Sequence, residues 1–379
     1  MTDDVIGIMH LSDVHYGNPR VDPYSITEGL RHTLPLTHNP WPNLRLFLVH
    51  GDYFDSDFRL AHDAAGPAQA GMVHILQFCK AHNLILRILE GTPKHDRKQS
   101  RHFSELNASI GYGVDVRHVC DLEIEHITPL GIDILYVPDE RNLCALDTFE
   151  EAQQLIRSRG LERVHLSSFH GAWLYQMPIV HKSYHDSAAW ANLVEWYIFS
   201  GHIHTHSRYL KNVSVGSWGR NFHGEEEDKG MLYSEHRLGE DGGQIDFIRN
   251  PCTRTFKTFE VFGMEYPAII DMIEAAQLPD RSAVRLRHDG STAIKTTLEL
   301  LAERYPQYTW TEVSKKEKTD EHEPGALDDA EMDEEVEFIS MTPENTGAML
   351  ERELRSGTVD LRGQSPEELM ALYKEVADE

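Results

Sequence analysis

The first part of the chain carries five short clusters of acidic residues and histidines: SDVHYG, HGDYFD, EGTPKHD, SSFHG and SGHIHTHS. Together they supply Asp13, His15, Asp52, His95, Asp96, His170, His202 and His204. Mixed oxygen and nitrogen ligands suit Mn²⁺, Fe²⁺, Zn²⁺ or Co²⁺, and disfavour thiolate zinc and iron–sulfur sites. One such cluster alone is explained as well by a turn and a cap. Five of them in order predict a dinuclear metal site.

Each cluster follows a short apolar segment that has the length of a β-strand. The segments are residues 6–11, 44–49, 84–89, 164–166 and 196–199. Apolar residues at helical spacing predict helices over residues 68–82, 148–158 and 187–194. Strands that alternate with helices predict an α/β fold. Ligands of such sheets bind at the carboxyl ends of the strands, where all five clusters are expected to converge.

The composition fits a folded and strongly acidic protein. The 379 residues include 36 basic and 62 acidic side chains, a formal net charge of −26, and 40% of them are hydrophobic. Four cysteines form no CxxC pair, no apolar stretch approaches the ~18 residues of a membrane span, and the first residues resemble no secretory signal. We therefore expect a cytoplasmic protein without membrane contact. The acidity argues against a simple nucleic-acid binder, because affinity for phosphates comes from Lys and Arg.

Half of the negative charge lies in the last part of the chain. Residues 313–379 hold 20 acidic and 7 basic side chains, and the densest stretch is residues 317–337. Such a run predicts a solvated linker rather than an acidic metal-binding segment. Two amphipathic helices are predicted after it, the second beginning at Ser365 and Pro366. They are too small to be stable alone, so they must pack on the body or dock on a partner.

The ordered motifs DVHYG, GDYFD, HD, FHG and GHIH resemble those of the calcineurin-like metallophosphoesterases. The resemblance covers roughly residues 5–210 and implies a four-layer αββα sandwich with two metal ions at the edge of the sheets. By position, one ion would be bound by Asp13, His15, Asp52 and His204, and the other by Asp52, His170 and His202. His95 would be the general acid, with Asp96 as its orienting partner. The implied cofactor is a pair of Mn²⁺ ions, with Mg²⁺, Fe²⁺ or Zn²⁺ as alternatives.

Two positions depart from the family pattern. The third motif is usually GNHD, whose Asn binds the second metal, whereas this chain has GTPKHD at residues 91–96. Thr92 or a water would have to fill that place, or the second ion would bind weakly. The repair nucleases of the superfamily usually have His where Asp55 stands.

The segment after GHIH favours a nuclease over a phosphatase. VGSWGR at residues 215–220, EEE at 225–227 and KG at 229–230 resemble a pattern of SbcD-type DNA-repair nucleases of bacterial or phage form. Two solvated hairpins are the alternative explanation. Candidate phosphate contacts lie close in sequence to the metal motifs: Arg97, Lys98, Arg101, Lys182, Arg208, Lys211 and Arg220.

The resemblance also suggests how the chain is divided. We expect a nuclease domain over residues 1–262, a small α/β capping domain over 263–313, an acidic linker over 314–341 and a helix–loop–helix over 342–379. The capping domain would position DNA, or serve only as a lid or a dimerisation domain. The last segment would bind an SbcC-type coiled-coil ATPase, giving a homodimer within a heterotetramer. The residues expected to make that contact are Leu350, Leu354, Leu369, Leu372, Tyr373 and Val376.

The sequence therefore predicts a metal-dependent DNA exonuclease or endonuclease. Two alternatives stay open. One is a metallophosphatase that acts on small phosphoesters or phosphoproteins, and the other is an ATPase-recruiting scaffold with a weakened second metal site.

Overall fold

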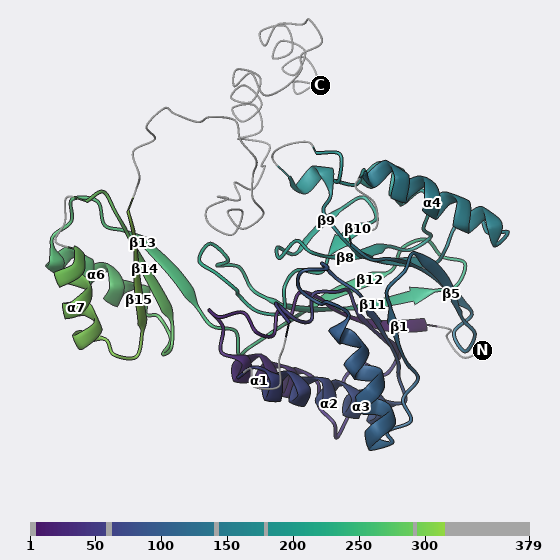
Figure 1. Cartoon of the computed structure of the whole chain (residues 1–379), viewed down its shortest axis with the longest axis horizontal. Helices are drawn as coiled ribbons and strands as arrows, with labels where there is room; N and C mark the ends of the chain where they lie inside the picture. Colours follow the sequence, from purple (N-terminus) through teal and green to yellow (C-terminus); the bar gives the residue numbers. More distant parts are fainter. Residues whose placement is uncertain (1–4, 58–62, 140–143, 178–180, 291–293, 315–379) are drawn as a thin grey trace, which may run out of the picture. The chain divides into compact units, whose positions relative to one another are not determined.

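The computed structural model describes residues 5–57, 63–139, 144–177, 181–290 and 294–314 (Figure 1). All of them fall within one compact unit of the chain. The described strands form two six-stranded sheets and one three-stranded sheet. The α/β fold predicted from the sequence is therefore confirmed.

The first six-stranded sheet has the order β12-β11-β1-β2-β3-β4. Its four strands β1 to β4 are parallel, and β11 and β12 continue the sheet in antiparallel pairing. The bounds are Val5–Leu11 for β1, Leu44–Val49 for β2, Ile85–Leu89 for β3, Val116–Val119 for β4, Gly230–Arg237 for β11 and Gln244–Arg249 for β12. The sequence predicted the first three of these strands, because they are buried and apolar.

The second six-stranded sheet has the order β5-β6-β7-β8-β10-β9. Strands β6, β7, β8 and β10 are parallel, whereas the edge strands β5 and β9 are antiparallel to their neighbours. The bounds are Glu123–Ile127 for β5, Ile132–Val137 for β6, Leu166–His170 for β7, Ile198–Gly201 for β8, Ser207–Tyr209 for β9 and Asn212–Ser214 for β10. Strand β7 begins where the strand predicted over residues 164–166 was expected to end, so His170 lies within the strand.

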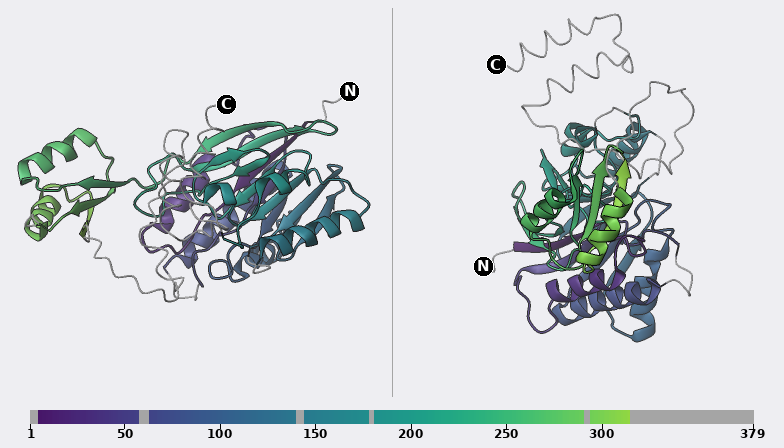
Figure 2. Two further views of the ribbon diagram at one scale, coloured as in Figure 1. Left: turned by 90° about the horizontal axis from the view of Figure 1, so that it is seen from above. Right: turned by 90° about the vertical axis from the view of Figure 1, so that its left-hand side faces the viewer.

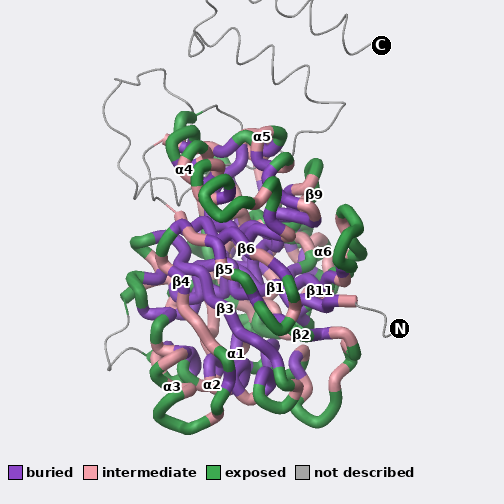
Figure 3. The backbone as a smooth tube through the Cα atoms, turned by 90° about the vertical axis from the view of Figure 1, so that its right-hand side faces the viewer, coloured by how far each residue is buried: buried purple, intermediate pink, exposed green. Residues whose placement is uncertain are grey.

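Three apolar cores hold these elements together. One packs α1 and α2 against the first sheet, a second combines side chains of both six-stranded sheets, and a third packs α4 and α5 against the second sheet. The helices are α1 Pro23–Thr33, α2 Ala65–His82, α3 His102–Ile110, α4 Ala145–Ser158 and α5 Ser187–Ala191, with short 3₁₀ turns at Gln99–Arg101 and Leu174–Gln176. Strands covered on both faces need apolar side chains throughout, and β1, β3 and β6 are buried along most of their length (Figure 3).

A chain of buried polar side chains crosses the interior. Its consecutive contacts are His236 Nε2 to Ser234 Oγ at 2.8 Å, Ser234 Oγ to His10 Nε2 at 2.8 Å, His10 Nδ1 to His50 Nε2 at 3.0 Å and His50 Nδ1 to Ser168 Oγ at 2.8 Å. Because Ser168 is in β7 and the others belong to the first sheet or the loop after β2, these hydrogen-bonded side chains tie the two sheets together.

The third sheet is parallel, with the order β13-β14-β15, and has its own apolar core with α6 and α7 (Figure 2). The bounds are Phe256–Glu260 for β13, Tyr266–Ala276 for α6, Ala283–His288 for β14, Ile294–Arg304 for α7 and Thr309–Ser314 for β15. The sequence predicted a small α/β domain in this region. It missed β13, which pairs with β14, so this sheet begins before the domain boundary predicted at residue 263.

None of the helices in the described part of the chain has the length and hydropathy that spanning a bilayer requires. The acidic linker and the two helices predicted after it lie outside the described residues.

Candidate metal centre

The loops that follow parallel strands of both six-stranded sheets bring the predicted metal ligands together. Their ligand atoms form three groups, and within each group all atoms lie within 4.8 Å of one another. The groups are Asp13–His15–His204, His15–Asp52–His95 and Asp52–His170–His202. Since His15 and Asp52 each belong to two groups, the three groups form one continuous cluster.

Four of these residues adopt a backbone conformation that side chains rarely take. The φ angles are +48° at Asp13, +53° at His15, +51° at Asp52 and +90° at His202. A non-glycine residue held with positive φ costs about 1–3 kcal/mol, and such residues gather at functional sites. The loops after β1, β2 and β8 thus accept local strain in the conformations that direct these side chains into one cluster.

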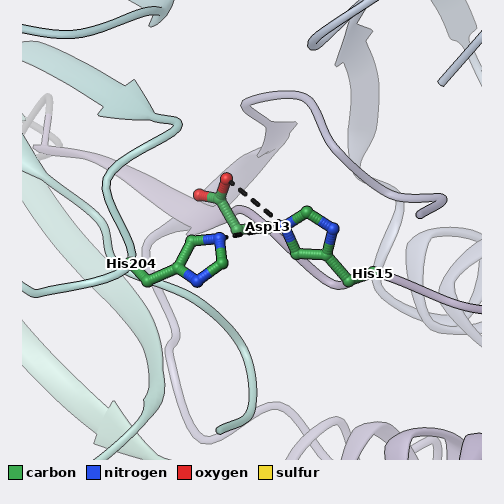
Figure 4. Close-up of side chains that lie close together, drawn as sticks. All are labelled: Asp13, His15 and His204. Atoms are coloured by element: carbon green, nitrogen blue, oxygen red, sulfur yellow. Dashed lines mark hydrogen bonds and ion pairs between the residues drawn. The ribbon is translucent and has the colours of Figure 1, made fainter. Parts of the chain in front are cut away.

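The first group lies between β1 and β8, and Figure 4 shows its three side chains facing one another. His15 Nε2 is 3.0 Å from His204 Nε2 and 4.0 Å from Asp13 Oδ1. Asp13 Oδ2 is buried and has no hydrogen-bond partner among the described residues. A buried carboxylate oxygen without a partner is unfavourable, and a bound cation would satisfy it.

The segment after GHIH holds His204 in place. Glu225 Oε1 accepts a hydrogen bond from His204 Nδ1 over 2.6 Å, and both Lys229 Nζ and the backbone N–H of Ser217 donate to the carbonyl of His204. A histidine that gives its Nδ1–H to a carboxylate presents Nε2 as a ligand, the usual arrangement at metal sites. The sequence placed Glu225 in the nuclease pattern but gave it no role, because its contact is tertiary.

The second group lies between β2 and β7. His170 Nε2 is 3.2 Å from Asp52 Oδ2, and His170 Nδ1 donates to the carbonyl of His50 over 2.6 Å. The hydroxyl of Thr92 lies 3.1 Å from Asp52 Oδ2 and 3.3 Å from His170 Nε2. His202 completes the group, and its backbone N–H donates to Asp13 Oδ1 over 2.9 Å. Thr92, predicted as a substitute ligand, therefore lies among the ligands of the second group.

Asp139 also lies at this group, and the sequence reasoning missed it. Its Oδ2 is 3.3 Å from Thr92 Oγ1 and 3.9 Å from His202 Nδ1. Asp139 follows β6 in the sequence ILYVPD, so it repeats the signal of an apolar strand that ends in an acid. It was overlooked because no histidine accompanies it.

Opposite charges stabilise one another in the second group. Burial raises the pKa of Asp52, but the charge of His170 and its hydrogen bond outweigh burial, and the net pKa lies well below the usual range. Burial lowers the pKa of His170, whereas the charge of Asp52 raises it more, so that the net pKa lies well above 6.5. In the first group burial lowers the pKa of His204, but the charge of Glu225 and its hydrogen bond outweigh burial, so that the net pKa is raised. The carboxylates of the cluster thus favour positive charge beside them, as a cation site requires.

The donor set fits divalent cations. Backbone carbonyls or carboxylates accept the Nδ1–H of His95, His170 and His204, which leaves Nε2 of each ring available inside the cluster. Asp13 and Asp52 add carboxylate oxygens, and Asp52 belongs to two groups, as a bridging ligand would. Imidazole and carboxylate ligands without thiolate suit Mn²⁺, Fe²⁺ or Zn²⁺. Candidate metal sites formed by His and Asp are thus present.

His95 stands at the edge of this cluster. Its Nδ1–H donates to the backbone carbonyl of Asp55 over 2.7 Å, and its ring packs edge-on against His15, with the centroids 5.1 Å apart. The carboxylate of Asp55 lies 3.2 Å from His15 Nδ1. Asp55 therefore contacts both rings, one through its backbone and one through its side chain.

Asp96 has a different role from the one implied by the resemblance. Its carboxylate accepts three backbone N–H groups, from Asp52 over 3.0 Å, Gly91 over 2.8 Å and Phe54 over 3.0 Å. The orienting contact of His95 comes instead from the Asp55 carbonyl. Burial, followed by the charge of Asp52, raises the pKa of Asp96 to about 7. Asp96 thus joins the loops after β2 and β3 and does not orient the ring of His95.

A further group of possible ligands, Glu90, His118 and Cys120, lies outside this cluster. His118 Nε2 is 2.6 Å from Glu90 Oε2, and Glu90 Oε1 accepts the backbone N–H of Lys98 over 2.6 Å. Both carboxylate oxygens are therefore satisfied within the protein, and the group anchors the loop that carries His95.

Some of the side chains predicted to contact phosphates are exposed, whereas others already bond to groups within the protein. Arg97, Lys98, Arg101, Lys182 and Arg208 are exposed. Arg208 packs on the ring of Tyr197, and Lys211 Nζ donates to two backbone carbonyls. Arg220 is buried and donates to the carbonyls of residues 226, 227 and 254. The structure therefore uses Arg220 and Lys211 to hold loops, and leaves the first five exposed.

No protein-family model matches the chain, and no curated protein matches it either.

The residues predicted to bind an ATPase partner, from Leu350 to Val376, lie outside the described residues.

Proposed function

We propose that this chain is a metal-dependent phosphodiesterase of the calcineurin-like metallophosphoesterase type, and that its substrate is DNA. The observation that carries the proposal is the continuous cluster in which Asp52 belongs to two ligand groups and His95 lies beside them. The three apolar cores support it further, because their order of helices, sheet, sheet and helices corresponds to the four layers that the resemblance implies.

The residues of the cluster have distinct tasks in this proposal. Asp13, His15, Asp52 and His204 would hold one divalent cation, and Asp52, His170 and His202 the other. Two bound cations lower the pKa of water to make a nucleophile and offset the charge of a phosphoryl group. Glu225 keeps Nε2 of His204 directed into the cluster, and the carbonyl of His50 does the same for His170.

His95 would deliver the proton that the leaving sugar oxygen needs. Because its Nδ1–H is donated to the Asp55 carbonyl, Nε2 is the atom that can pass a proton to the substrate. Asp96 supports this indirectly, since it accepts the backbone N–H of Gly91 at the start of the turn that leads to His95, and joins this turn to the loop after β2 through the N–H of Asp52.

Two observations favour DNA over a small phosphoester. The segment that resembles SbcD-type nucleases contributes Glu225 and Lys229, which anchor His204, so the pattern belongs to the site itself. Arg97, Lys98 and Arg101 lie within six residues of His95 and are exposed. We further propose that the chain works as the nuclease subunit of an SbcC/SbcD-like complex, as a homodimer that binds a coiled-coil ATPase through its last residues.

The test is cleavage of end-labelled duplex and hairpin DNA with Mn²⁺, with and without the neighbouring ATPase. A generic phosphomonoester is assayed in parallel. We expect DNA cleavage that His95→Asn slows by ~10²–10⁴-fold. Rapid turnover of the monoester without DNA cleavage would refute the nuclease.

A metallophosphatase remains the second candidate, and one observation favours it. The first 312 residues hold 42 acidic and 29 basic side chains, and a negative body does not attract DNA unaided. The same pair of assays decides between the two, because a phosphatase would cleave the monoester and leave DNA intact. A scaffold without chemistry of its own would cleave neither substrate.

A further inference from the structure

In the third cluster, GTPKHD, Gly91 and Thr92 stand where the family's GNHD has its Gly and its Asn. A Cβ atom built on Gly91 would overlap both the backbone N and Oδ1 of Asp52. Residue 91 therefore has to be Gly, because any side chain there would displace the residue that links the two ligand groups. The place of the Asn falls to Thr92, and its ligand role is met either by Thr92 or by a residue from elsewhere in the fold.

Thr92 fills only part of that place. Its hydroxyl lies 3.1 Å from Asp52 Oδ2, and its backbone N–H donates to Asp52 Oδ1 over 2.6 Å. Both contacts hold Asp52 in position. The usual oxygen ligands of Mn²⁺ are carboxylate and carbonyl oxygens and water, and a hydroxyl is not among them, so Thr92 alone does not replace the missing amide.

The end of β6 brings a carboxylate to the same point. Strand β6 pairs in parallel with β7, with Val137 opposite Phe169, so the residues that follow β6 lie beside His170 and Gly171. Asp139 Oδ1 lies 3.6 Å from where a Cβ on Gly171 would be. Asp139 Oδ2 is 3.3 Å from Thr92 Oγ1 and 3.9 Å from His202 Nδ1, and its side chain is 15% exposed.

The spacings around Thr92 Oγ1 match those of ligands around one ion, whereas Asp139 Oδ2 lies farther from His202 Nδ1, at 3.9 Å. Ligand atoms that lie ~2.1 Å from a cation in tetrahedral or octahedral geometry are ~3.0–3.4 Å apart. The contacts of Thr92 Oγ1 with Asp52 Oδ2, His170 Nε2 and Asp139 Oδ2 are 3.1, 3.3 and 3.3 Å, and His170 Nε2 is 3.2 Å from Asp52 Oδ2.

We propose that Asp139 is a ligand of the second cation and takes the place of the missing amide. This inference rests on the proposed two-metal site but not on the identity of the substrate. A carboxylate adds a negative charge that an amide lacks. With Asp13, Asp52 and Asp139 together, two divalent cations leave a net charge of about +1 on the ligand set. The second ion is therefore bound firmly, in contrast to the weakened second site that GTPKHD alone suggests.

The experiment counts metal ions without measuring catalysis. The full chain is dialysed against Mn²⁺, the bound metal is measured by mass spectrometry, and the coupling between two Mn²⁺ ions is followed by electron paramagnetic resonance. We expect two ions and a coupled signal for the wild type. Asp139→Ala should keep one ion, lose the coupled signal and bind the second ion at least ~10-fold more weakly.

Two further variants make the outcome specific. Asp139→Asn supplies an amide and should restore the coupled signal at higher Mn²⁺ concentration. Asp121→Asn, an exposed carboxylate after β4, is the matched control and should bind two ions like the wild type. One ion in the wild type, or two ions of unchanged affinity in Asp139→Ala, would overturn the proposal.

The outcomes also separate this inference from the proposed function. Two ions in the wild type and one in Asp139→Ala, together with no cleavage of DNA, would support the ligand and refute the nuclease. DNA cleavage by the wild type, together with unchanged metal binding in Asp139→Ala, would support the nuclease and refute Asp139 as a ligand.

Discussion

The carboxylate of Glu225 accepts the Nδ1–H of His204 over 2.6 Å, 21 residues along the chain. Glu225 is buried, and its second oxygen accepts the backbone N–H of Asn221 over 2.7 Å, so the carboxylate is fixed on both sides. A contact of this kind sets the tautomer of a metal-binding histidine and raises its basicity. The segment beyond GHIH is thus part of the candidate metal centre.

The first prediction concerns this contact. Glu225→Gln keeps the size of the side chain but removes its charge, so His204 loses the partner that favours Nε2 as the ligand. We expect affinity for the first metal ion to fall by ~10–100-fold, measured by equilibrium dialysis. Glu227→Gln, two residues away, is the control, because Glu227 is half-buried and contacts Lys229 and Thr205 rather than a ligand side chain. Equal losses in both variants would contradict the assigned role.

The second prediction concerns proton delivery. His95→Asn should lower kcat for DNA cleavage by ~10²–10⁴-fold, since it removes the group that protonates the leaving oxygen. Metal content should stay at the wild-type level. His102→Gln lies close in sequence, with an exposed ring paired to Glu105, and should change neither quantity. Loss of bound metal in His95→Asn would show that His95 is a ligand instead.

The third prediction concerns Asp96. Asp96→Ala leaves the buried N–H groups of Asp52, Phe54 and Gly91 without an acceptor, at about 1–3 kcal/mol each. The free energy of unfolding, measured in urea without metal, should fall by about 3 kcal/mol or more. Asp96→Asn retains an oxygen acceptor and should lose less. Asp57→Asn, exposed in the loop after β2, should have little effect. A stability like that of the wild type in Asp96→Ala would refute this role.

The fourth prediction concerns pH and the buried histidines. Burial lowers the pKa of His236 to about 4, and burial followed by the charges of His50 and His236 lowers the pKa of His10 well below 6.5. These rings stay neutral in the folded chain while the unfolded chain takes up protons below pH 6.5. The stability that these two rings contribute is therefore fully present above pH 6.5 and is lost as the pH falls towards 4.

The size of this effect can be measured through one residue. Each group contributes about 1.4 kcal/mol per pH unit in that range, so His236 accounts for about 2 kcal/mol between pH 6.5 and pH 5. Urea unfolding of His236→Gln should show a pH dependence that is weaker by that amount. His38→Gln, which replaces an exposed ring in contact with Thr37 Oγ1, is the control and should follow the wild type. An unchanged pH dependence in His236→Gln would contradict the prediction.

The sequence was informative where one strand and one cluster were adjacent in the chain. Apolar runs predicted β1, β2, β3 and β8, and the acids and histidines that follow them meet in one cluster, because parallel strands bring their carboxyl ends to one edge. Edge strands such as β9 and β12 went unnoticed, because their exposed residues lack that apolar signal.

The rest of the candidate site could not be predicted from the sequence, because it depends on contacts between distant parts of the chain. Asp139 carries the same strand-end signal as the others but stands alone, and only the pairing of β6 with β7 places it beside His170. The role of Asp96 was implied by the family resemblance, whereas its carboxylate accepts backbone N–H groups of the loop after β2. Neither contact has a periodicity or spacing from which it could be derived.

The position of His50 joins the site to the interior of the fold. Its carbonyl holds the ring of His170, and its own ring belongs to the buried polar chain between the two sheets. A local opening of the loop after β2 would have to break the hydrogen bonds between those buried side chains, which makes the loop part of a large cooperative unit. The amides of His50 and Asp52 should therefore exchange with solvent deuterium as slowly as those of the central strands, even when the metal ions have been removed.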